Sequence, residues 1–261
     1  MVFRIAQLEL VTDLRAHVCV WLAVVAIASF AVPVGAGQIA NEEYLSALER
    51  GDLDTAARLV TAGVDIDAHR TDGKTLLILA AKESDVILVR KLIAAGANVD
   101  ATTNNGGTAL MFAAIRGDIE TQTALIDAGA DVNAVGGFDW TALMVASVKG
   151  HVAAVRQLLS SGADPNLRDI YGWTPLMRAV YEEREQVVQV LLEQAEVNLN
   201  AKNDQGATAL HLAAAKGNEA LTRSLLLAGA DPSMGDRKGR TPENMAVAAG
   251  HENTAKLLKR P

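Results

Sequence analysis

The strongest constraint on the fold of this chain is a segment of about 33 residues that recurs along it. Residues 108–134 (TALMFAAIRGDIETQTALIDAGADVNA) return almost unchanged as residues 141–167 (TALMVASVKGHVAAVRQLLSSGADPNL). A threonine marks the same point of successive copies at intervals of 33, 33, 33, 34 and 33 residues, at Thr75, Thr108, Thr141, Thr174, Thr208 and Thr241. Self-similarity at a fixed period of this length is typical of solenoids, so the chain is predicted to be a stack of small units.

Each copy carries the signals of two short helices and a turn. The hydroxyl of Thr141 can accept a hydrogen bond from a free amide at the start of a helix. Gly150 and Gly162 can end the first and second helix in a left-handed conformation. Residues 164–166 (DPN) then turn the chain into an extended finger. Because two helices and a turn cannot bury their apolar faces alone, neighbouring units must stack.

This pattern resembles the ankyrin repeat. The residues that carry the resemblance are Thr-Pro-Leu-Met at 174–177, Thr-Ala-Leu-His at 208–211, Gly-His at 150–151 and 250–251, and Gly-Ala-Asp or Gly-Ala-Asn starting at Gly96, Gly129, Gly162 and Gly229. The resemblance covers about residues 41–260 and implies an all-α solenoid of about seven helix-turn-helix units with short β-turn fingers. The expected units of this domain, residues 41–261, are 41–69, 70–102, 103–135, 136–168, 169–202, 203–235 and 236–261. The first and last are expected to act as end caps.

Units four and five depart from the pattern. Glu183 and Ala195 replace glycines in unit five, and one residue is added within residues 195–200. We therefore expect the turn around Glu183 to be reshaped and the finger after Ala195 to bulge. In unit four Asp139 stands where other fingers have glycine, which is a mild misfit because aspartate tolerates left-handed geometry.

Residues 1–40 lie outside the repeat. Arg4 and Arg15 precede an apolar run at 18–34, and residues 34–36 (VGA) have the form of a signal-peptidase site. These features predict a secretory signal, residues 1–36, cleaved after Ala36. An N-terminal membrane anchor is the alternative, because the 17 apolar residues lie at the short edge of a membrane span. In both cases the flanking charges place the repeats outside the cytoplasm. The expected location is the bacterial periplasm, or the inner membrane with the repeats outside, as in exported bacterial ankyrin-repeat proteins.

Catalytic, metal and cofactor sites find no candidate in the sequence. The net charge of −7 argues against nucleic acid and anionic membrane as main partners. Cys19 is the single cysteine, so neither a disulfide framework nor a cysteine metal site is available. The resemblance explains His151, His211 and His251 as residues that orient a neighbouring turn. We therefore expect no enzyme activity, no cofactor and no metal.

The aromatic residues are the candidate binding site. Phe138 and Tyr171 are one repeat apart, as are Trp140 and Trp173, so stacking predicts one exposed aromatic ledge on the fingers of units four and five. Three further residues, Phe112, Arg178 and Tyr181, are expected in the groove beside it. Tryptophan, tyrosine and arginine are enriched at binding hot spots. The alternative is that each tryptophan only stiffens its finger.

The function that the resemblance implies is non-catalytic binding of a partner protein through the concave groove and the finger tips. The chain is expected to be monomeric, and the sequence does not identify its partner. An accessory or protective subunit of an exported envelope or redox enzyme is the alternative function.

Overall fold

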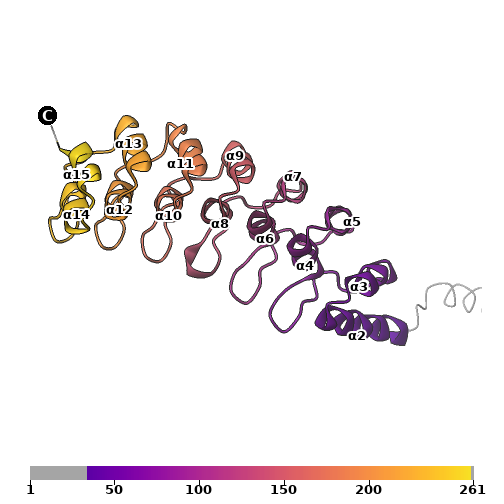
Figure 1. Cartoon of the computed structure of the whole chain (residues 1–261). Helices are drawn as coiled ribbons and strands as arrows, with labels where there is room; N and C mark the ends of the chain where they lie inside the picture. The colour runs from indigo at the N-terminus through magenta and orange to yellow at the C-terminus, as the bar shows by residue number, and fades with distance from the viewer. Residues whose placement is uncertain (1–33, 260–261) are drawn as a thin grey trace, which may run out of the picture.

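The computed structural model describes residues 34–259, whose helices alternate between two layers of an elongated stack (Figure 1). The inner layer holds the first helix of each unit: α2 (Val34–Arg50), α4 (Leu76–Glu83), α6 (Ala109–Arg116), α8 (Ala142–Lys149), α10 (Pro175–Tyr181), α12 (Ala209–Lys216) and α14 (Pro242–Ala248). The outer layer holds the second: α3 (Leu53–Leu59), α5 (Val86–Ala94), α7 (Ile119–Asp127), α9 (Val152–Ser160), α11 (Glu185–Leu192), α13 (Glu219–Leu227) and α15 (Glu252–Leu258). Two short 3-10 helices, η1 (Val60–Ala62) and η2 (Gly137–Asp139), complete the set. This confirms the predicted all-α solenoid of helix-turn-helix units.

The recurring threonine begins the inner helices as predicted. Thr141 is the N-cap of α8, and its hydroxyl accepts from the backbone N of Met144 at 3.3 Å. The same bond recurs in units two, three and five. Gly150 then ends α8 with φ 82°, in the left-handed conformation that glycine adopts at low cost. The sequence therefore sets both ends of α8.

The turn after α10 keeps the standard geometry, so the expectation of a reshaped turn at Glu183 is wrong. Glu183 has φ 57°, close to the 71° of Gly217 one unit on. The next residue explains this, because Arg184 Nε donates to the carbonyl of Val148 at 2.9 Å. One unit earlier, His151 makes the corresponding contact to a backbone carbonyl. The neighbouring unit thus holds the turn in place whether or not it contains glycine.

The added residue of unit five is absorbed after α11. A ladder of Asp and Asn side chains accepts backbone amides of the next unit, usually 31 residues on, as in the bond from Asp164 N to Asn133 Oδ1. In unit five the step is 32 residues, from Asn198 N to Asn166 Oδ1. The extra residue therefore lies before Asn198, in the turn that follows α11, and the finger at Asn203 keeps the geometry of its neighbours instead of bulging. Ala195 does not take the left-handed conformation that Gly162 has.

The first helix of the stack extends ahead of the expected first unit, residues 41–69. This helix, α2, begins at Val34 instead of near Asn41. Residues 1–33 of the predicted signal lie outside the described residues, and the predicted cleavage site falls in the first turn of α2. Among the helices of residues 34–259, none combines the length and the apolar character that a membrane crossing requires.

Candidate functional site

The fingers are the loops that precede the inner helices α4 to α14, and all project from the same side of the stack (Figure 1). Three of them are shaped by an oxygen acceptor at their first residue. Asp169 Oδ1 accepts from the backbone N of Tyr171 and of Trp173, both at 2.9 Å. Asn203 and Asp236 make the same pair of bonds in units six and seven. A hydrogen bond from the Arg240 side chain holds the pKa of Asp236 at about 2.

Finger four lacks this acceptor because Gly136 occupies the position of Asp169. Its backbone takes a different path, with φ 60° at Phe138 and 57° at Asp139. The expected left-handed aspartate is confirmed, whereas the left-handed Phe138 was not foreseen. Two consecutive non-glycine residues in this region store strain, and such strain is common at functional sites.

The finger ladder is also interrupted at finger four. Elsewhere a backbone amide of one finger donates to a carbonyl of the finger before it, as from Ile170 N to Phe138 O at 3.1 Å and from Asp204 N to Tyr171 O at 3.0 Å. The corresponding bond from Gly137 N to Asn105 O is absent between these described residues. Fingers three and four are therefore joined less tightly than their neighbours.

Arg178 organises the groove of units four and five, where the groove means the face between the inner helices and the fingers. Its guanidinium carbon lies 4.9 Å from the ring centre of Trp140 and 4.8 Å from that of Trp173. Arg178 Nε donates to Asp169 Oδ2 at 2.8 Å, and Nη2 pairs with the same oxygen. Because the Asp169 side chain is fully buried, this ion pair fixes the guanidinium between the two indoles.

A second chain of contacts continues from Trp173 into unit six. Tyr181 meets Trp173 edge to face with ring centres 5.2 Å apart. Lys216 Nζ lies 4.5 Å from the ring centre of Tyr181 and 3.3 Å from Glu183 Oε1. The charged and aromatic groove residues of units four to six therefore bind one another through cation–π, ring and ion-pair contacts.

The predicted site residues thus fall into two groups. The four finger aromatics lie on adjacent fingers as the repeat spacing predicts, but they do not form one exposed ledge. Phe138 and Tyr171 are 68% and 53% exposed, while Trp140 and Trp173 are half-buried against Arg178. The other two groove residues, Phe112 and Tyr181, are half-buried and 45% exposed respectively.

A cavity of about 930 Å³ opens in the groove between units three and four. Its walls include Phe112, Phe138 and Trp140 of the predicted site, and also Gly107 and Val145, which the sequence reading missed as site residues. No charged side chain lines it. The signal that could have found the cavity is Gly107 itself, which stands where the next two units have tryptophan.

Two of the repeat histidines, His151 and His211, make the contacts to a neighbouring unit that are expected of them. His151 Nε2 lies 3.0 Å from the carbonyl of Ile115 in the preceding unit. The His211 ring accepts from Thr208 N at Nδ1, so Nε2 carries the proton and donates to Arg240 O at 2.9 Å. Burial lowers the pKa of His211. Within residues 34–259, no cluster of three His, Cys, Asp or Glu side chains suits a metal ion.

Comparison with known families decides the identity of the fold. The sequence pattern described as "Ankyrin repeats (3 copies)" matches residues 44–136, 125–203 and 195–260. The chain is an ankyrin-repeat protein. As a class, ankyrin repeats are protein–protein interaction scaffolds that are generally non-catalytic.

Solved and curated relatives of this ankyrin-repeat protein are consistent with that assignment. The crystal structure of the ankyrin repeat domain of Bcl-3, "a unique member of the IkappaB protein family", superposes with a TM-score of 0.73 at 32% identity, covering 83% of this chain and 97% of that one. Tyrosine-protein kinase HTK16 of Hydra vulgaris is 41% identical over 61 residues, or 23% of this chain. Neurogenic locus notch homolog protein 4 of Homo sapiens is 49% identical over 55 residues, or 21% of this chain. The matched segments span only 8% and 3% of those two proteins.

Proposed function

We propose that this protein binds one partner protein in its groove and at its finger tips, without catalysing a reaction. The observation that carries the proposal is the apolar cavity between units three and four, with the strained and largely exposed Phe138 at its wall. The missing acceptor at Gly136 accounts for the backbone path of finger four, but folding does not require a phenylalanine at a left-handed position where its ring is 68% exposed to water. A partner surface that buries this ring accounts for the choice of residue.

The predicted site residues divide the work in this proposal. Phe138, Tyr171 and Tyr181 are the exposed rings that a partner would cover. Arg178, fixed between Trp140 and Trp173, forms a rigid part of the groove next to the fingers that carry Phe138 and Tyr171. Aromatic and arginine side chains that are already ordered lose little conformational entropy on binding, which favours affinity.

Photo-crosslinking tests the proposal. A benzophenone amino acid placed at Phe138 should capture a partner in the native cells, whereas the same group at Leu227 should not. Leu227 is a fair control, because it is 88% exposed and lies on the outer helix α13. Equal capture from both positions, or none from Phe138, would contradict a groove-binding function. A captured enzyme in stoichiometric amount would identify the protein as an accessory or protective subunit of an exported envelope or redox enzyme.

We also propose that the protein works as a monomer in the bacterial periplasm, with an inner-membrane anchor as the alternative. The supporting features are Arg4 and Arg15 ahead of the apolar run at 18–34, followed by the VGA site. N-terminal sequencing of the protein from its own cells should start at Gly37 if the signal is cleaved. A product that keeps Met1 and fractionates with the cytoplasm would refute both the signal and the anchor.

A further inference from the structure

We propose that the cavity between units three and four receives one large apolar side chain of a partner segment that also carries a carboxylate about one helical turn away. The cavity is named here the Gly107 cavity, and its walls include Gly107, Phe112, Phe138, Trp140 and Val145. This inference rests on the proposed function and adds to it the place of the main anchor and the chemistry of the bound segment.

The repeat itself shows what fills the equivalent space one unit later. There, Arg178 lies between Trp140 of the preceding finger and Trp173 of its own finger. Shifting each of these positions back by one unit gives Gly107, Val145 and Trp140. Two of the three large side chains are thus replaced by small ones, and the Gly107 cavity is the space that they leave.

The same shift indicates an uncharged and mainly apolar guest, because Asn104 and Asn105 carry the only amide side chains among the described residues of the cavity wall. In unit five the buried carboxylate of Asp169 neutralises the guanidinium of Arg178. The equivalent residue in unit four is Gly136, and no charged side chain lines the cavity. A cationic guest would therefore lose its hydration without gaining a counter-ion, which is unfavourable. A phenylalanine, tryptophan, leucine or methionine side chain meets no such penalty.

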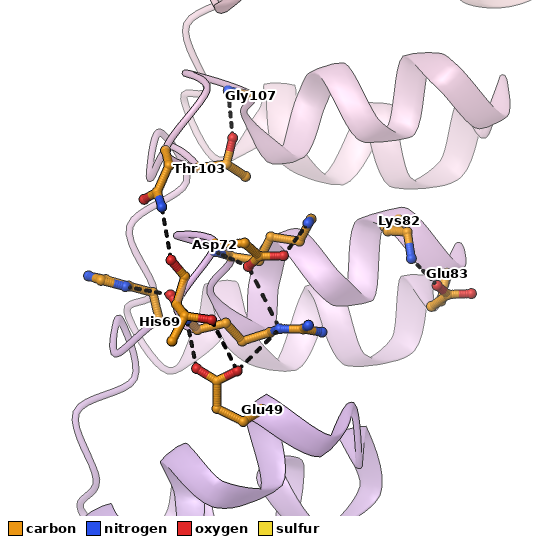
Figure 2. A network of polar contacts seen from close by, with 11 residues as sticks. Glu49, His69, Asp72, Lys82, Glu83, Thr103 and Gly107 are labelled. Carbon is orange, nitrogen blue, oxygen red and sulfur yellow. Dashed lines mark hydrogen bonds and ion pairs between the residues drawn. The ribbon is translucent and has the colours of Figure 1, made fainter.

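Finger three keeps the cavity open on its Gly107 side. Figure 2 shows Thr103 Oγ1 accepting from the backbone N of Gly107, a bond of 3.0 Å. A Cβ atom at Gly107 would lie 3.3 Å from the Phe112 ring, and the φ of Gly107 is not in the left-handed range. The same Cβ atom would lie 3.2 Å from Thr103 Oγ1, so a side chain at this position enters the cavity beside Phe112 once Thr103 and the ring shift by a few tenths of an ångström, with no strained φ.

Charge around the cavity indicates the second feature of the guest. Arg116 and Lys149 occupy the same position in the last turns of α6 and α8, one repeat apart, and both are exposed. No salt bridge engages either of them within residues 34–259. The corresponding lysines farther along the stack are paired, Lys82 with Glu83 in unit two and Lys216 of unit six with Glu183 of unit five.

These two cations stand out in a chain whose net charge is −7. Arg116 follows Phe112 by four residues, which is a rise of about 6 Å along the helix axis. A carboxylate one helical turn from the apolar anchor can therefore reach this edge. Asp139 carries an exposed negative charge next to Phe138 on the finger side, which turns the acidic end of the segment toward α6 and α8.

Selection from a library of short random linear peptides, displayed on phage and panned against the full chain, tests this inference. Enriched peptides should pair a large apolar residue with Asp or Glu, and their affinities are then measured by fluorescence polarisation. Gly107→Trp should fill the cavity and weaken their binding by about tenfold or more. Phe138→Ala should weaken binding similarly while leaving the melting temperature unchanged, because this ring is largely exposed.

Reversing both cations tests the charge. Arg116→Glu with Lys149→Glu should weaken binding about 3- to 30-fold at low salt and less at high salt. The matched control reverses Arg90 and Lys91 on the outer helix α5, which gives the same change in net charge and should leave affinity within about twofold. Enriched peptides that lack carboxylates and bind the Arg116→Glu, Lys149→Glu variant with unchanged affinity would overturn the acidic part of the inference.

The remaining outcomes separate the cavity from the proposed function. If no enriched peptide loses affinity in Gly107→Trp and Phe138→Ala, the Gly107 cavity is not the anchor site. Should those peptides still lose affinity in Tyr171→Ala, groove binding stands and only the cavity inference fails. Dependence on the α5 pair alone would refute both.

Discussion

Glu183 holds a left-handed backbone conformation that glycine holds in most other units, so Glu183→Gly should stabilise the protein. Its φ of 57° costs a side-chain-bearing residue about 1 kcal/mol more than it costs glycine. Against this, the variant loses the ion pair between Glu183 Oε1 and Lys216 Nζ, which are 3.3 Å apart. Both side chains are partly exposed, so that pair contributes about 0.2–1 kcal/mol. The net gain should be a few tenths of a kcal/mol.

Two matched variants make this magnitude testable by urea unfolding. Ser84 ends α4 with φ 62° and carries no charge, so its replacement breaks no ion pair. Ser84→Gly should therefore raise the free energy of unfolding by the full amount of about 1 kcal/mol. In a Lys216→Gln background the pair is already gone, and Glu183→Gly should then gain the same amount. Each gain should appear as a higher urea midpoint at constant slope. If Glu183→Gly destabilises the Lys216→Gln protein while Ser84→Gly stabilises its parent, the assumed cost of the left-handed turn at Glu183 is refuted.

Three further predictions follow from single side chains. Gln122 is fully buried on α7 with no partner for its amide among the described residues, so Gln122→Leu should raise stability by about 1–3 kcal/mol in urea unfolding, and a loss would contradict this. Burial lowers the pKa of His211 from its ordinary value of 6.5, so the free energy of unfolding should be highest above that pH and should fall as the pH drops below it. His211→Met should remove this fall, which is at most about 1.4 kcal/mol per pH unit, in urea unfolding at several pH values. Trp173→Ala should lower the melting temperature, because its ring packs on Arg178 and Tyr181. Tyr171→Ala should weaken partner binding and leave the melting temperature nearly unchanged, because its ring is largely exposed. Equal melting temperatures for the two variants would refute the assignment of Trp173 to packing and Tyr171 to partner contact.

The predictable part of the fold is the part that each unit repeats. Thr141 and Gly150 have local roles, one accepting an amide and the other tolerating a left-handed backbone, so their spacing alone predicts the helix ends. Glu183 shows the limit of this reasoning. Its residue type suggests a changed turn, but the contact from Arg184 to the preceding unit preserves the geometry. Neighbour contacts of this kind are not visible in the residue type at one position.

The candidate site was less predictable because it depends on what is missing. The conformation of Phe138 follows from the absence of a side-chain acceptor at Gly136, and this emerges only when the finger is compared with that of Asp169. Spacing correctly placed Trp140 and Trp173 on adjacent fingers, yet the contact of both rings with Arg178 needed coordinates. An empty space between side chains leaves no signature in the identity of any single residue.

Trp140 connects the two halves of the groove. One side of its ring packs on Arg178, whose position is fixed by the buried Asp169, and the ring also forms a wall of the Gly107 cavity. A wall that is already ordered does not lose conformational freedom when a guest arrives, so more of the burial energy appears as affinity. The self-satisfied contacts of units four and five are therefore the physical reason why the adjacent, unfilled cavity can act as a preorganised binding site.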